Sequence, residues 1–257
     1  MEYSTEHGRL LGEAEAAWRA EDYGRAAELF RQAAALAPED ADAAFFADAS
    51  AALAEGADYR RIAPLAEPAQ RAIACAARRS GSGKAYFDAC CRVVSAVVSV
   101  TSRHYEAVEA YRNREQKKRR RTPEAPVSAD ALLRDCVNLV TAAAKQTAGA
   151  ALECAQDLSE ADEFFWNALL TLLDNARTYR FAAELESDPE IGALMYEIEK
   201  LRGNVFGDYT GVEDLPEDEG EYVETVCPAC GETLSFAPDE LSGGPVECPF
   251  CGGRIDV

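Results

Sequence analysis

Two short cysteine phrases near the end of the chain have the residue types and the spacing of a metal site. The phrase Cys-Pro-x-Cys-Gly occurs at 227–231 and again at 248–252, and 17 residues separate Cys230 from Cys248. Two cysteines with two residues between them can place both thiolates on one ion, and the glycine that follows accepts the positive φ that such a tight turn tends to need. Two such pairs at this separation are typical of a four-cysteine zinc site.

The residues between and after the phrases favour a small β-fold. The stretch 232–236 alternates polar and apolar side chains as a strand does, Ser-Gly-Gly at 242–244 offers a turn, and 244–247 and 254–257 can pair beside it. The region 226–257 resembles the zinc ribbon family. This resemblance implies one Zn²⁺ with four thiolate ligands, which leave no open position for water or substrate, so the ion would be structural. The ligands implied are Cys227, Cys230, Cys248 and Cys251.

The same phrases could serve other cysteine chemistry, namely a redox-active pair, an iron centre of rubredoxin type or a disulfide knot. No thioredoxin-like βαβ pattern surrounds either phrase, which disfavours the redox pair. Five further cysteines lie within helical patterns, which favours reduced, buried thiols over disulfides. These five are Cys75, Cys90, Cys91, Cys136 and Cys154.

The composition predicts an acidic, mainly helical and cytoplasmic protein. A net charge of −20 and a pI near 4.5 argue against a general attraction to nucleic acid or to anionic lipid. Abundant alanine favours helix over sheet. The first ten residues lack the basic and apolar regions of a signal peptide, and the longest apolar run, Val93–Val100, is too short to span a bilayer. We therefore expect no membrane contact.

The segment 14–40 resembles a single tetratricopeptide repeat, a helix-turn-helix unit. Its first helix departs from the repeat pattern, since Ala14 and Ala17 replace the usual glycine and large aromatic residue, and a generic alanine-rich hairpin remains the alternative. One repeat cannot bury its own apolar face, so the helix expected over 40–56 would pack on it. The matching residues are Tyr23, Ala26, Phe30, Ala33 and Pro38.

Two long helices with apolar seams are expected over 84–121 and from Ser128 onward. In both, apolar residues follow one another at alternating spacings of four and three, as in a coiled coil. Pro123 and Pro126 enforce a break between them, so the pair is predicted to form an antiparallel αα-hairpin. The first seam contains Tyr86, Cys90, Val93, Val97, Val100, His104, Ala107 and Tyr111, and the second contains Leu133, Cys136, Val140, Ala143, Thr147, Ala150 and Cys154.

Two further helices complete the predicted bundle. The first starts near Ser159 and Asp162, which approximate a capping box, and the second opens at 187–189 and closes at Gly203. The first would cover the hairpin with Phe164, Phe165, Leu169, Leu172, Leu173, Ala176 and Tyr179. The predicted organisation is a repeat-like region at 1–56, a bundle at 57–203, an acidic linker at 204–225 and the ribbon at 226–257.

A dense basic segment at 112–121 could contact nucleic acid or an acidic partner. The alternatives are a solvated helix C-terminus, which the helix dipole favours, and neutralisation by the acidic linker. No interleaved aromatic residues accompany the segment, which places nucleic acid behind these alternatives. Its cations are Arg112, Arg114, Lys117, Lys118, Arg119, Arg120 and Arg121.

These patterns favour a non-enzymatic adaptor over an enzyme. The predicted fold is mainly α, with helical hairpins and coiled-coil-like helices in a bundle, plus the small β zinc ribbon. His7 and His104 are the two histidines, and His104 is predicted to be an interface histidine because no nucleophile or carboxylate can be assigned to it. We expect the helical body and ribbon to engage a protein partner, with self-association through the long helices as a further option. A nucleic-acid-associated regulator that uses ribbon and basic segment is the alternative function.

Overall fold

The computed structural model divides the chain into two compact units, Met1–Tyr209 and Thr210–Val257. In the first unit it describes residues 5–54, 58–80, 83–119, 128–155 and 157–206. In the second it describes residues 223–226, 228, 233–236, 246–247 and 254–255.

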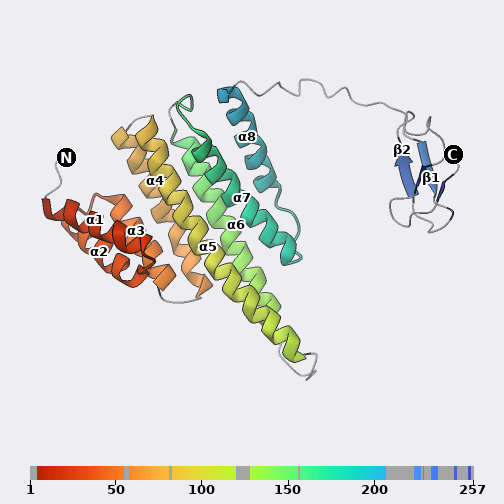
Figure 1. Cartoon of the computed structure of the whole chain (residues 1–257), viewed down its shortest axis with the longest axis horizontal. Coiled ribbons are helices and arrows are strands. Elements are labelled where there is room, and N and C mark those ends of the chain that lie inside the picture. The colour runs from red at the N-terminus through yellow and green to blue at the C-terminus, as the bar shows by residue number, and fades with distance from the viewer. Residues whose placement is uncertain are drawn as a thin grey trace. The chain divides into compact units, whose positions relative to one another are not determined.

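The described part of the first unit is helical, which confirms the mainly α prediction (Figure 1). The helices are α1 (Thr5–Arg19), α2 (Tyr23–Leu36), α3 (Ala41–Ala54), the short 3₁₀ helix η1 (Tyr59–Leu65), α4 (Ala66–Ser80), α5 (Lys84–Arg119), α6 (Ser128–Glu153), α7 (Glu163–Ala182) and α8 (Pro189–Phe206). They pack as a helical bundle around one large apolar core, in which α5 and α6 are central.

The first three helices form two consecutive helical hairpins. Asp22 begins α2, since its carboxylate accepts a hydrogen bond from the Arg25 backbone N–H at 3.2 Å. Ala26 and Phe30 of α2 are buried, and the Phe30 ring stacks on Phe46 of α3 at 5.4 Å. Helix α3 is buried on two faces because it lies between α2 and the core around α5.

The buried positions of helix α5 are not the same as those of the predicted two-helix seam. The predicted seam is buried from Tyr86 to His104, but Tyr111 is 37% exposed and Ala107 is half-buried. Tyr105 and Val108 are buried in their place. A straight helix has 3.6 residues per turn, so a strict seam of four and three drifts around it by about 20° per heptad. The buried face has therefore rotated away from the predicted positions at the far end of α5.

Helix α7 begins later than the sequence predicted. Asp162 caps it, because its carboxylate accepts a hydrogen bond from the Phe165 N–H at 3.0 Å, whereas Ser159 lies outside the helix and is exposed. This start places Phe165 and Trp166 in the core and leaves Phe164 81% exposed. The prediction that Phe164 covers the hairpin is therefore wrong, and Trp166 takes the core position.

Helix α6 follows its predicted seam over most of its length. Its predicted positions from Leu133 to Thr147 are buried, while Ala150 and Cys154 are half-buried. Tyr86 of α5 donates a hydrogen bond to the Ala151 carbonyl oxygen at 2.7 Å, so the two long helices are also joined by a buried polar contact.

One helix in the described part of the chain, at 84–118, is long and apolar enough by composition to cross a membrane. Its most apolar 18-residue window has a mean hydropathy of 1.2, and 56% of that window is buried within the protein. The core helix of a soluble protein has the same character, so α5 supplies only weak evidence for a membrane span.

The second unit contains two antiparallel hairpins. Strand β1 (Val223–Val226) pairs with β2 (Thr233–Phe236), and β3 (Val246–Glu247) pairs with β4 (Arg254–Ile255). Strand β2 lies within the stretch 232–236, and its partner β1 starts within the stretch that the sequence pattern assigned to the linker. The sequence predicts that 244–247 and 254–257 pair beside this strand, whereas the described strands β3 and β4 pair with each other in a second sheet.

Candidate functional site

Each described strand pair of the second unit flanks one cysteine phrase along the sequence. Val226 pairs with Thr233 in the first hairpin, and Glu247 pairs with Arg254 in the second. The segments between these partners, 227–232 and 248–253, are equal in length and begin with the phrase Cys-Pro-x-Cys-Gly. Cys227, Cys230, Cys248 and Cys251 themselves lie outside the described residues.

This repeated arrangement suits a pair of metal-binding turns. An antiparallel strand pair brings the two ends of its connecting segment together, and each cysteine phrase falls within such a segment. The strands are only two or four residues long, which leaves little apolar surface to stabilise them without a staple. A group of three or more His, Cys, Asp or Glu side chains suited to a metal does not occur among the described residues, which exclude these four cysteines.

The five cysteines of the helical unit are free thiols. Burial raises the pKa of Cys90 and of Cys136 to about 12, and it raises the pKa of Cys91 to about 11. A thiol with so high a pKa carries almost no thiolate at neutral pH and is a poor nucleophile. Cys90 and Cys136 are fully buried and therefore act as packing residues, whereas Cys91 is half-buried and lines a pocket.

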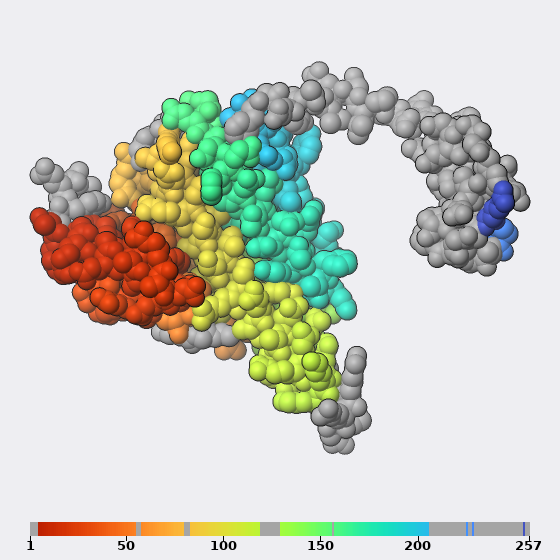
Figure 2. Space-filling model, in the orientation of Figure 1, coloured from red at the N-terminus to blue at the C-terminus, as the bar shows by residue number. Residues whose placement is uncertain are grey.

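The basic segment lies at the end of α5 that projects beyond α7 (Figure 2). Its Arg112 is bound within the fold, because its guanidinium donates to the Ala182 carbonyl oxygen of α7 at 3.3 Å and lies 3.9 Å from Asp130 of α6. Lys118 pairs with Glu115 at 2.6 Å. Arg114 and Lys117 are exposed, while the side chains of Arg119, Arg120 and Arg121 lie outside the description. Part of the predicted contact surface thus stabilises the bundle itself.

His104 is fully buried on α5 and contacts the backbone of Ala52 near the end of α3. Burial lowers its pKa, although the nearby backbone of Ala52 and the charge of Asp58 act in the opposite direction. The imidazole is therefore neutral at pH 7. It occupies a helix interface, as its seam position predicts.

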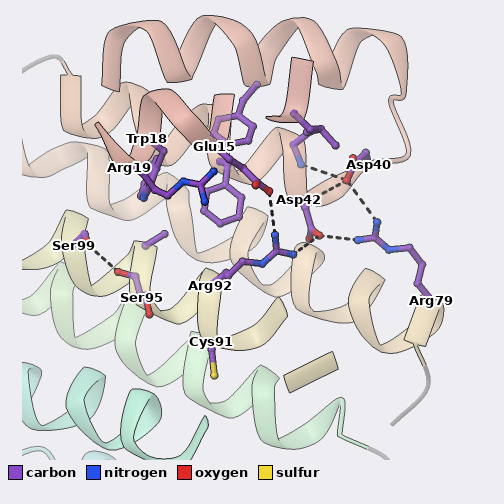
Figure 3. A pocket seen from close by; sticks show the side chains of 15 residues that line it. Glu15, Trp18, Arg19, Asp40, Asp42, Arg79, Cys91, Arg92, Ser95 and Ser99 are labelled. Carbon is purple, nitrogen blue, oxygen red and sulfur yellow. Dashed lines mark hydrogen bonds and ion pairs between the residues drawn. The ribbon is translucent and has the colours of Figure 1, made fainter. Parts of the chain in front are cut away.

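A pocket that no sequence motif marked lies within the helical unit (Figure 3). It has a cavity volume of about 570 Å³ and is walled by α1, α2, α3, α4 and α5. The aromatic part of the wall comes from Trp18, Phe30 and Phe46, whose rings contact one another at centroid distances of 5.4 to 5.5 Å. Ser95 and Ser99 of α5 lie on the opposite wall.

A chain of ion pairs crosses one end of this pocket (Figure 3). Arg92 of α5 lies 3.5 Å from Glu15 of α1 and 4.0 Å from Asp42 of α3. Arg79 of α4 continues the chain, at 3.0 Å from Asp42 and 3.8 Å from Asp40. Four helices thus contribute to one charged network, which holds the repeat-like region against the bundle.

The most buried members of this network are the carboxylates of Asp40 and Asp42, and Asp40 also makes contacts outside the network. Asp40 accepts hydrogen bonds from the Asp42 and Ala43 backbone N–H groups at the start of α3, and its second oxygen lies 3.2 Å from the buried His7 Nε2. Burial raises the pKa of Asp42, and the nearby Arg79 charge partly opposes this shift. Sequence reasoning found none of this network, because its residues are far apart along the chain.

The three arginines of the lining differ from its carboxylates in exposure. Arg92 and Arg79 are 55% and 39% exposed and Arg19 is exposed, whereas Asp40 and Asp42 are 4% and 20% exposed. Glu15 is the one lining carboxylate that is about half exposed, at 48%. The guanidinium groups of the lining are therefore more accessible to solvent than the Asp40 and Asp42 carboxylates.

Comparison with protein-family models, with curated proteins and with solved structures found no match to this chain.

Proposed function

We propose that this protein is a cytoplasmic, non-enzymatic adaptor, in which a helical body carries a small zinc-stapled module that docks on a protein partner. The observation that carries the proposal is a repeated arrangement: two short antiparallel strand pairs, each of which flanks a Cys-Pro-x-Cys-Gly phrase along the sequence. Four thiolates on one ion would complete its coordination. The metal would therefore stabilise the surface of the module and would not take part in catalysis.

The helical unit supports this proposal through its residue chemistry. Its buried thiols Cys90 and Cys136 have raised pKa values, and His104 is neutral at a helix interface. Cys90, Cys136 and His104 therefore have packing roles. The proposal includes a second contact surface, which the three-helix region α1–α3 with its tetratricopeptide-like residues would offer.

The proposal is tested by affinity capture of the full chain from native lysate, with and without nuclease. Wild type is compared with the double variant Cys227→Ser/Cys230→Ser, and Cys136→Ser serves as the matched control because it removes a cysteine from the helical core. We expect protein partners that survive nuclease, are lost with the double variant and are kept with the control.

Two results would contradict the adaptor function. If partners bind the double variant as well as wild type, the terminal module does not recognise them. Partners that disappear after nuclease would favour the nucleic-acid alternative, and the exposed Arg114 and Lys117 would then be the first residues to replace.

A further inference from the structure

We propose that the pocket between α1, α3, α4 and α5 binds a small amphipathic carboxylate, with its apolar body against Trp18 and Phe46 and its carboxylate on Arg92 and Arg19. This inference goes beyond the adaptor function and does not depend on it, since all the residues involved lie in the helical unit.

The volume and lining of the pocket fit a small molecule. A cavity of about 570 Å³ is within the usual range for ligand sites, which are mostly apolar and carry a few converging polar groups. Trp18, Phe30 and Phe46 form a continuous aromatic wall on the side of the repeat-like region. An aliphatic or aromatic body of matching size would remove the half-buried Trp18 and Phe46 rings from water, whereas Phe30 is already buried.

The accessible charge fits an anion. Arg92 is 55% exposed, and its one hydrogen bond to Glu15 is long, at 3.5 Å, so most of its five N–H donors are not used by that contact. Arg19 is exposed on the same wall as Trp18, next to it on α1. Guanidinium groups bind carboxylates in a bidentate manner, which makes a carboxylate the favoured head group.

The carboxylates behind the arginines serve to hold them in place. Asp42 is 20% exposed and lies 3.0 Å from Arg79 and 4.0 Å from Arg92. Of the two head-group arginines, Arg92 is therefore already positioned by ion pairs, which reduces the ordering cost of binding. Glu15 is the exception, because it is accessible and competes directly for Arg92.

The test uses decanoate below its micelle concentration as the probe, titrated into the full chain and followed by calorimetry and tryptophan fluorescence. Decylammonium and decan-1-ol are the matched cationic and neutral probes. We expect saturable binding of decanoate, together with a change in fluorescence that Trp18→Phe removes, since the second tryptophan, Trp166, is fully buried in the core. Neither matched probe should bind as tightly.

Two substitutions should change the affinity for decanoate in opposite directions. Arg92→Gln removes the main head-group contact and should weaken binding by about tenfold or more, as expected for a lost charged hydrogen bond. Glu15→Gln removes the competitor of Arg92 and should tighten binding. Arg71→Gln removes an exposed arginine of α4 that pairs with Glu67 outside the pocket, so it should leave the affinity unchanged.

Several results would overturn the proposal. They are decylammonium binding that equals decanoate binding, a fluorescence change that persists in Trp18→Phe, or unchanged affinity in both Arg92→Gln and Glu15→Gln. Glu15 is half exposed, so its variant keeps the test valid if Arg92→Gln fails to fold. Circular dichroism of each variant checks that the helical unit is intact.

Discussion

The two histidines lie in different surroundings although both are buried. His7 lies 3.2 Å from the Asp40 carboxylate, whereas His104 contacts the Ala52 backbone in an apolar helix interface that lowers its pKa. Asp58 favours the protonated form of His104 and Arg103 opposes it, but burial is the largest effect. Protonation of His104 therefore works against the fold.

Replacing His104 should remove a pH dependence of stability. The folded-state pKa lies below the ordinary value of 6.5, so as pH falls below about 6.5 the unfolded chain binds a proton that the folded chain does not, and folding is destabilised. Urea denaturation at about pH 7.5 and about pH 5.5 should show a larger loss for wild type than for His104→Gln. An equal loss in both proteins would show that His104 is not the group responsible.

At the scale of elements, capping and packing start helix α7 at a later residue than the sequence pattern suggested. Ser159 and Asp162 both resemble cap residues, but only Asp162 accepts a hydrogen bond from a first-turn N–H group of α7. Because the helix starts after Asp162, Trp166 enters the core while Phe164 faces solvent. One choice of cap thus decides which aromatic residues are buried.

This choice predicts unequal effects of two alanine substitutions. Asp162→Ala should lower the free energy of unfolding by about 1 kcal/mol, because it leaves the Phe165 N–H without its acceptor. Ser159→Ala should change it by less than about 0.5 kcal/mol, as is usual for an exposed position. Chemical denaturation of both variants measures the difference. A larger loss for Ser159→Ala would mean that the helix begins at the earlier cap.

At the scale of the whole molecule, the chain divides at Tyr209 and Thr210 into a helical unit and a short terminal unit. The helical unit has a large apolar core, whereas the described strands of the terminal unit are short. The two units should therefore depend on different sources of stability: apolar burial in the first and the proposed metal in the second.

Removal of the metal should unfold one unit and spare the other. We expect one zinc ion per chain by elemental analysis of wild type and almost none in Cys230→Ser. Amide resonances of the terminal unit should collapse in that variant or after chelation, while those of the helical unit keep their positions. Zinc that remains bound to Cys230→Ser with full stoichiometry would contradict the four-thiolate site.

Local patterns in the sequence determined much of the helical part of the fold. Capping residues, prolines and apolar spacing act within a few residues of each other, so the positions of α5, α6 and α8 and most of the buried faces of α5 and α6 followed from them. Helix α8 ends at Phe206 and not at the predicted Gly203. The spacing of the two cysteine phrases likewise depends on neighbours along the chain, which is why it predicts a metal site before any fold is known.

Only the tertiary structure decided the pocket and the use of the basic segment. Arg92 and the Glu15 that it contacts are 77 residues apart in the sequence, and Arg79 and Asp42 are 37 residues apart. No local pattern could therefore predict either pair. Arg112 likewise reaches Ala182 across 70 positions and becomes part of the bundle. Such contacts form only when helices pack, because packing brings side chains that are distant in sequence within hydrogen-bonding distance.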